Sequence, residues 1–154
     1  MQSHGEHDKG TAYRNFAIEM AIDFTIMYFV MYTMIDTVAH LYLNVNNVYM
    51  TLMMVAPMAL LMLLSMRSMF RSKTWNMAIG VAAVVIFVLS YAGMRTQAGV
   101  GDRQFLRSMI PHHSGAILMC QQASLTDPEI VALCRDIVES QRAEIAKMQA
   151  LLAR

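Results

Sequence analysis

The residues with the clearest chemical potential lie in one stretch of the chain, DRQFLRSMIPHHSGAILMC, residues 102–120. On a helix with 3.6 residues per turn, its sulfur and imidazole side chains fall within about one third of the circumference. Thioethers and thiols select Cu(I), and imidazole also binds copper. The pattern therefore indicates a site for a soft ion, copper as Cu(I) or silver, and the candidate ligands are Met109, His112, His113, Met119 and Cys120.

The same residues also admit a structural interpretation, which the sequence leaves open. Met109 and Met119 would then fill a helix interface, and one histidine would lie at the surface. Catalysis is not expected, because no nucleophile–base pair, carboxylate dyad or phosphate-binding loop accompanies the histidines. Glu139 and Glu144 are expected to face solvent.

A second set of thioethers lies in residues 48–66, VYMTLMMVAPMALLMLLSM, within a chain that holds 17 methionines. Met50, Met54 and Met58 are four residues apart and could store an ion or pass it on. Upstream, Asp36 and His40 are spaced to touch on one helix face. Ionisable groups at membrane depth usually mark function, although a hydrated pair in the interface is the equal alternative.

Three apolar stretches must position these residues, at about 16–43, 48–66 and 75–94. A membrane-spanning helix needs roughly 20 apolar residues. The sequence therefore predicts four parts: a polar, flexible tail over 1–15, which carries His4 and His7, a three-helix membrane domain over 16–95, a linker over 96–101 and a helical hairpin over 102–154.

The placement of Lys and Arg predicts the orientation. Residues 67–73 carry Arg67, Arg71 and Lys73, whereas the connection LNVNNV carries no basic residue. We expect a multi-pass protein of the plasma (inner) membrane, with a cytoplasmic N-terminus and a periplasmic or extracellular hairpin. No cleavable signal peptide is evident. The net charge of +1 gives no argument for binding to nucleic acid. The expected partner is the lipid bilayer, because of the three apolar stretches.

The hairpin is expected to start with Asp102 as the cap of its first helix, and Pro128 should begin the second helix, which runs to about residue 153. With the turn near Asp127, residues at equal distance from it face each other. Cys120 then meets Cys134, and an oxidising compartment would allow a disulfide. The other pairs expected at one level are His113 with Gln141, and Met109 with Ile145 and Met148.

The motifs DxxFxxxMIPHHxxAIxM, residues 102–119, and QxxEIxxM, residues 141–148, resemble the domain of unknown function 305 family. The membrane part resembles that of its multi-span members. The resemblance implies a ferritin-like, all-helical fold and a role in binding copper and silver and in resistance to them. It implies the metal ligands Met109, His112, His113, Met119 and Met148. Soluble members can carry two hairpins and this chain has one, so a second copy would complete a four-helix bundle.

The sequence thus predicts an all-α fold with three transmembrane helices and an external two-helix hairpin, half of a ferritin-like four-helix bundle. The predicted function is a membrane-anchored Cu(I)/Ag(I) binding or delivery protein of metal homeostasis or tolerance. Its expected partners are further copies of the chain and a metal-donor or metal-acceptor protein. The alternative is a non-catalytic accessory or oligomer-forming subunit of a membrane assembly, with methionine used for helix packing.

Overall fold

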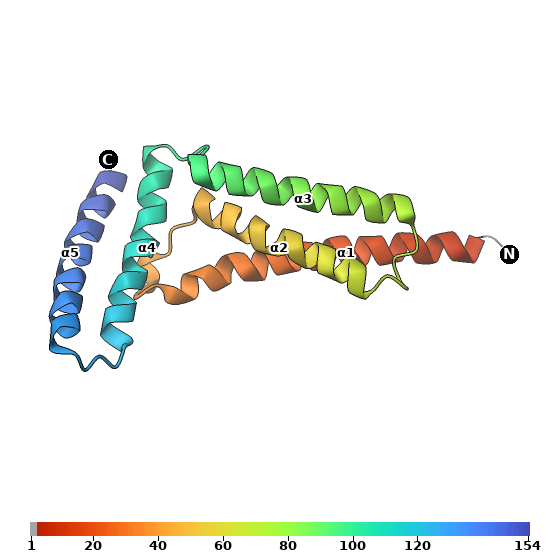
Figure 1. The fold of residues 1–154 in the computed structure, drawn as a ribbon. Helices are drawn as coiled ribbons and strands as arrows, with labels where there is room; N and C mark the ends of the chain where they lie inside the picture. Colours follow the sequence, from red (N-terminus) through yellow and green to blue (C-terminus); the bar gives the residue numbers. More distant parts are fainter. Residues whose placement is uncertain (1–2) are drawn as a thin grey trace. The chain divides into compact units, whose positions relative to one another are not determined.

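The computed structural model describes residues 3–154, with side chains from residue 10 onward, so the side chains of His4 and His7 lie outside the described residues. Over this range every regular element is a helix (Figure 1). The elements in order are α1 Ser3–Val30, the 3-10 helices η1 Met31–Met34 and η2 Val38–His40, α2 Val45–Ser65, α3 Lys73–Thr96, α4 Asp102–Gln122 and α5 Pro128–Leu152. The all-α fold class is therefore confirmed for the described residues.

Three helices are long and apolar enough to cross a membrane, as expected. These candidate spans are Gly10–Met34, Val45–Ser65 and Lys73–Thr96. In the most apolar window of each, only 11%, 28% and 17% of the residues are buried inside the protein. Apolar side chains left uncovered to this extent need a non-aqueous neighbour, which suggests membrane association.

The first helix corrects two expectations from the sequence. It begins at Ser3, so residues 3–15 are helical and form no separate tail. It ends at Val30, well before the end of the apolar stretch 16–43, because the chain turns into η1 and η2. There the Tyr32 hydroxyl donates to the Tyr42 carbonyl oxygen at 2.8 Å. This contact within the connecting segment overrides the helix that composition alone predicts.

The chain divides into two compact units, and the first contains residues up to 29 and residues 48–98. Tyr13 joins α1 to the start of α3, since its hydroxyl donates to Asn76 Oδ1 at 2.7 Å. Its ring centroid lies 5.3 Å from that of Phe70. The buried residues of this core are Phe16, Ala56, Ala59, Leu63, Phe70 and Ala83.

Gly93 of α3 lies where Tyr49 of α2 passes closest. A Cβ at position 93 would meet the Tyr49 ring at 2.8 Å, and that ring is held because its hydroxyl donates to the Ala98 carbonyl at 2.7 Å. Gly93→Ala should therefore lower the free energy of unfolding by about 1–3 kcal/mol. Gly80→Ala is the matched control, because a Cβ there meets only Leu60 Cδ2, at 3.9 Å. Thermal unfolding in detergent checks this, and equal midpoints for the two variants would contradict it.

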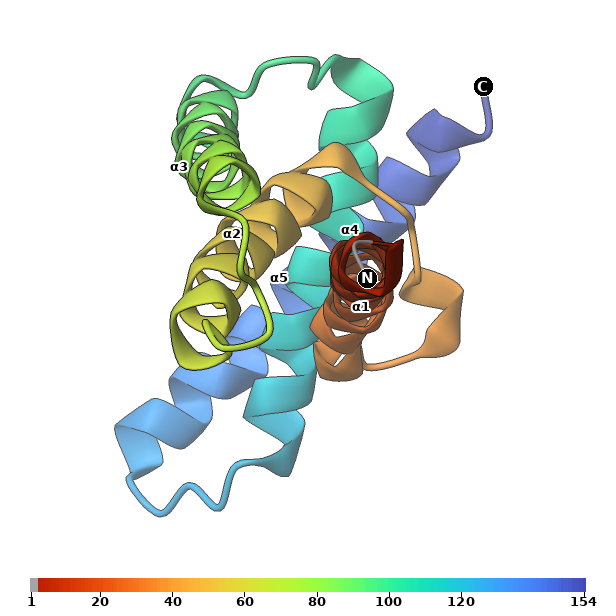
Figure 2. The same ribbon diagram turned by 90° about the vertical axis from the view of Figure 1, so that its right-hand side faces the viewer.

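The second unit contains residues 30–47 and 99–154, and its main feature is the antiparallel pair α4 and α5, side by side in Figures 1 and 2. Asp127 caps α5 by accepting from the N–H groups of Glu129 and Ile130 at 2.8 and 3.3 Å. The sequence predicts Asp102 as the N-terminal cap of α4, but in the structure the cap is Gly101. Asp102 is the first helical residue, and its negative charge at the N-terminus of the helix interacts favourably with the helix dipole.

The hairpin core lies between α4 and α5 and runs along their length. Its buried residues are Ile110, Ile117, Ile145 and Met148. Ile110 and Ile117 have no exposed surface. We call the line of contact between the two helices the seam, and the side chains that face it form the candidate site.

Candidate functional site

His113 is the buried member of the histidine pair, with 7% of its surface exposed. It lies one turn after Met109 on α4, and its Nδ1 is 2.9 Å from the Met109 carbonyl oxygen. A carbonyl oxygen only accepts hydrogen bonds, so Nδ1 carries a proton and donates it. This bond orients the ring and leaves Nε2 to face α5.

On the α5 side, Nε2 of His113 lies 2.6 Å from Oε2 of Glu144. Gln141 was expected opposite His113, and the contact corrects that expectation, because the partner is Glu144. Helical side chains lean toward the N-terminus of their helix, so Glu144 reaches back to the level of Gln141. The Glu144 side chain is still 55% exposed. An imidazole protonated only at Nδ1 and a carboxylate both present lone pairs, so this contact requires a proton between Nε2 and Oε2, supplied by one of the two groups.

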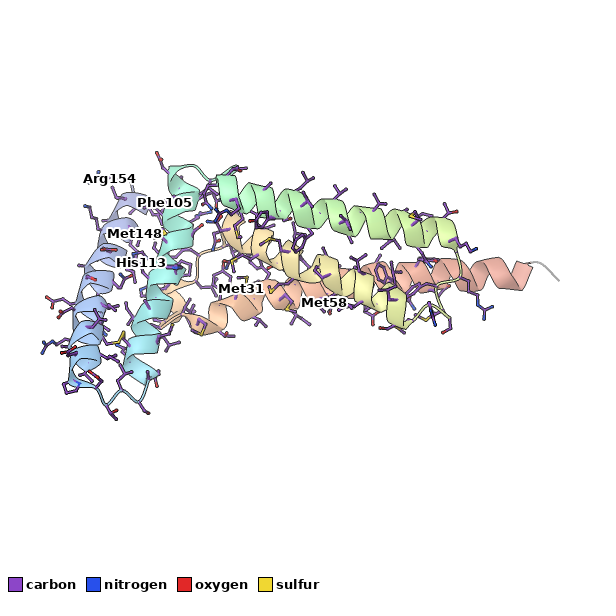
Figure 3. The ribbon with its side chains drawn as sticks, viewed as in Figure 1. Met31, Met58, Phe105, His113, Met148 and Arg154 are labelled. Carbon is purple, nitrogen blue, oxygen red and sulfur yellow. A yellow bond between two sulfur atoms is a disulfide. The ribbon has the colours of Figure 1, made fainter. Side chains whose placement is uncertain are left out.

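Two thioethers meet the same part of the seam. Met148 of α5 is 8% exposed and belongs to the core, and Met109 of α4 packs against that core, as the predicted register requires. Met109 precedes His113 by one turn, and Met148 follows Glu144 by one turn. The four side chains therefore come from two facing helices at neighbouring levels, and Figure 3 labels His113 and Met148.

Cys120 and Cys134 form a disulfide, as the register predicts, with their Cα atoms 5.3 Å apart. This separation is typical of disulfides. Metal ions bind the thiolate form of cysteine, which a disulfide sulfur cannot supply. Cys120 is therefore not a metal ligand in the oxidised protein, contrary to the prediction. Its bond instead ties α4 to α5 beside their turn.

His112 and Met119 lie on the outer flank of α4 and not in the seam. His112 is exposed, and its ring centroid is 6.0 Å from that of His113. Met119 is 59% exposed and is not part of the hairpin core. The structure therefore separates these two predicted ligands from Met109, His113 and Met148.

Asp36 and His40 do not share a helix face, because α1 ends at Val30 and His40 closes η2. Both instead meet Ser114 of α4, which has no exposed surface. The Asp36 N–H donates to Ser114 Oγ at 2.7 Å, and this oxygen lies 2.9 Å from His40 Nδ1. The two residues attach the connecting segment to α4, and they do not join the seam.

A second polar link extends from this segment to α5. In the amide orientation that satisfies its neighbours, Gln121 donates to Asp36 Oδ1 at 2.9 Å and accepts from Arg142 Nη2 at 2.8 Å. The segment also passes close to α4 at Gly115, where a Cβ would lie 3.4 Å from the Met34 carbonyl oxygen. The connecting segment is therefore an integral part of the second unit.

Ser114→Ala should destabilise the second unit, because the partly buried Asp36 N–H loses its acceptor. We expect a loss of about 1–3 kcal/mol in the free energy of unfolding. Ser140→Ala is the control, since the Ser140 side chain is exposed and only bonds its own helix, at the Ile137 carbonyl. Denaturant unfolding followed by helical circular dichroism would show the difference. Identical unfolding midpoints for Ser114→Ala and Ser140→Ala would contradict a stabilising role of the Asp36–Ser114 hydrogen bond.

Met50, Met54 and Met58 lie on α2 in the first unit. Met50 and Met54 are 40% and 38% exposed, and Met58 is half-buried (Figure 3). None of the three belongs to the core of the first unit, whereas Met62 packs against it. These thioethers thus face outward, and they are a set separate from the residues of the seam.

Within the described part of the chain, no three His, Cys, Asp or Glu side chains form a group that could hold a metal ion. The soft donors that lie in or against the interior of the hairpin are the imidazole of His113 and the thioethers of Met109 and Met148. The sequence interpretation missed Glu144 as a partner of His113, although its spacing of four residues from Met148 places both on one face. It also missed Ser114, for which a small residue next to the histidine pair was the only signal.

Comparison with known proteins places residues 90–152 in a family model described as Domain of unknown function (DUF305). The chain is also similar to an uncharacterized protein of Acanthamoeba polyphaga mimivirus. The two are 36% identical over 119 residues, which cover 76% of each chain. No solved structure matches the chain.

Proposed function

The chain belongs to the DUF305 family, and we propose that it is a membrane-anchored protein that binds a soft monovalent metal ion, Cu(I) or Ag(I), in the seam between α4 and α5. Its role would be binding or delivery in metal homeostasis or tolerance, without catalysis. The observation that carries the proposal is the setting of His113. Its Nδ1 is bonded to backbone and its Nε2 faces the Glu144 carboxylate, while Met109 and Met148, each one helical turn from one of these two residues, pack in the hairpin core.

The donor set fits a soft ion. A histidine that ligates a metal usually donates its other ring N–H to a carbonyl or carboxylate, as His113 does toward Met109. Imidazole and thioether sulfur are both ligands that suit Cu(I). The proposed ligands are Nε2 of His113 and the sulfurs of Met109 and Met148. The half-exposed Glu144 carboxylate would turn toward water and leave Nε2 to the ion.

The proposed placement puts the hairpin outside the plasma membrane and the N-terminus in the cytoplasm. The loop with Arg67, Arg71 and Lys73 supports a cytoplasmic side between α2 and α3. The disulfide supports an oxidising compartment for the hairpin. A second copy would complete a ferritin-like four-helix bundle, and Met50, Met54 and Met58 would offer exchangeable sites for transfer.

Replacing both seam methionines with leucine tests the proposal. Leucine conserves volume, so Met109→Leu and Met148→Leu should each cost less than about 1.5 kcal/mol of stability. We expect the affinity for Cu(I), measured by competition with a chromogenic chelator, to fall about tenfold or more. Met50→Leu with Met54→Leu is the control, because those side chains lie in the first unit.

The alternative function is an accessory or oligomer-forming subunit, with methionine used for packing. It is favoured by the outward position of Met50 and Met54 on α2, where a neighbouring helix would cover them. Under this alternative, leucine at positions 109 and 148 leaves the affinity for Cu(I) unchanged. That result would remove the seam from the proposed function.

A further inference from the structure

A second feature of the hairpin is an apolar groove of about 530 Å³ beside its turn. Met34, Leu118, Met119, Leu125 and Ile130 line it together with the disulfide. Met119 and Ile130 are 59% and 46% exposed, so the groove is open at its rim. A volume of this order is typical of sites that hold a small apolar ligand.

One wall of this groove is a residue at the end of a candidate membrane span. Met34, one of its walls, is the last residue of the candidate span Gly10–Met34. The Met34 carbonyl oxygen lies against Gly115, and the Asp36 N–H bonds Ser114 at 2.7 Å. The end of a span lies at the edge of the hydrocarbon layer. The groove therefore begins where that layer ends.

A second contact connects α4 to the next span. Val45 begins the candidate span Val45–Ser65, and its N–H donates to Oε1 of Gln104 at 3.3 Å. Gln104 and Ser114 are about 15 Å apart along α4, at 1.5 Å per residue. Both contacts are made by residues at or next to the ends of candidate spans, so two points along α4 are attached to segments that lead directly into membrane-spanning residues.

From these contacts we infer that the groove holds a lipid acyl chain of the outer leaflet, so that the turn of the hairpin rests in the bilayer interface. This inference rests on the membrane placement proposed above. Amphipathic helices that lie in the interface bury their apolar residues below the headgroups. Met34, Leu118 and Ile130 supply such a surface without a charged side chain in the lining. A second copy of the hairpin is the competing occupant, and the experiment separates the two.

Quenching of tryptophan fluorescence by lipids with brominated acyl chains is the direct test. The chain has one tryptophan, Trp75, at the start of α3. In the parent protein, reconstituted in phosphatidylcholine vesicles, quenching of Trp75 reports the insertion of the spans. In a Trp75→Phe background, Ile130→Trp places the probe in the groove. Leu125→Trp is a second groove probe, and Glu139→Trp is the control on the exposed outer side of α5.

We expect brominated lipid to reduce the emission of both groove probes by about half and to leave the Glu139→Trp probe unchanged. Quenching of Trp75 without quenching of either groove probe would overturn this inference and leave the membrane placement intact. Groove probes that are shielded from lipid only when protein is concentrated in the vesicles would show a second copy, which also overturns it. Absence of Trp75 quenching would refute the membrane placement itself.

Discussion

We expect Ag(I) to bind about a hundredfold more weakly once His113 is replaced with alanine. The substitution removes Nε2, the ring nitrogen that faces α5 across the seam and that we propose as a ligand. Ag(I) is the preferred probe because it is soft, like Cu(I), and is not readily oxidised. Isothermal titration of the full chain in detergent measures the change.

His112→Ala is the matched control for this prediction. It removes the same chemical group from the neighbouring position, but His112 is exposed and lies outside the seam. We expect its affinity for Ag(I) to stay close to that of the parent protein. Equal losses in His112→Ala and His113→Ala would contradict the assignment of the site to the seam.

A further variant separates metal binding from folding. The amide nitrogen of asparagine at position 113 could still donate to the Met109 carbonyl, as Nδ1 of His113 does, but asparagine has no counterpart of Nε2. His113→Asn should therefore retain helical content and lose affinity. If His113→Asn bound Ag(I) as tightly as the parent protein, imidazole would not be a ligand.

The second large effect concerns the hairpin core. Ile117→Ala should lower the free energy of unfolding by about 2–5 kcal/mol, because it removes buried methyl groups and leaves a cavity. Ile117 has no exposed surface and contacts the core between the two helices. Denaturant unfolding in detergent, followed by circular dichroism, measures the loss.

Leu133→Ala is the control for Ile117→Ala, since the Leu133 side chain is 58% exposed. Its effect should stay within about 0.5 kcal/mol. A loss at Leu133 as large as that at Ile117 would show that the outer face of α5 is covered in solution. It would then be an interface between copies of the chain.

Several features of the fold could be predicted because they depend on local sequence alone. The apolar stretches 48–66 and 75–94 are long and uninterrupted, so they indicate candidate spans wherever the rest of the chain lies. The turn at residues 126–129 sets the register of the hairpin. That register brings Cys120 to Cys134, and the disulfide follows from it.

The connecting segment 30–47 could not be predicted, because distant residues determine its conformation. Composition favours a continued helix there, but the Asp36 N–H finds its acceptor on Ser114 and the Val45 N–H finds one on Gln104. Periodicity does not reveal such contacts between residues far apart in the chain. The same limit explains why Asp36 and His40 were predicted to share a helix face.

The candidate site was predicted in part, for a different physical reason. A helical wheel correctly groups Met109 with His113, yet it also includes His112 and Met119, which the structure leaves exposed. The wheel gives the direction of a residue but not how deeply a neighbouring helix buries it. The contact between Glu144 and His113 arises because the long Glu144 side chain leans along α5 toward the start of the helix. The pairing of levels between the two helices does not take this lean into account.

The most direct test of the central claim is X-ray absorption at the copper edge of the full chain loaded with Cu(I). The account predicts a first coordination shell of one imidazole nitrogen and two sulfur atoms, and loss of the sulfur contribution in the Met109→Leu, Met148→Leu variant. A shell of nitrogen and oxygen alone in the parent protein, without sulfur, would contradict it.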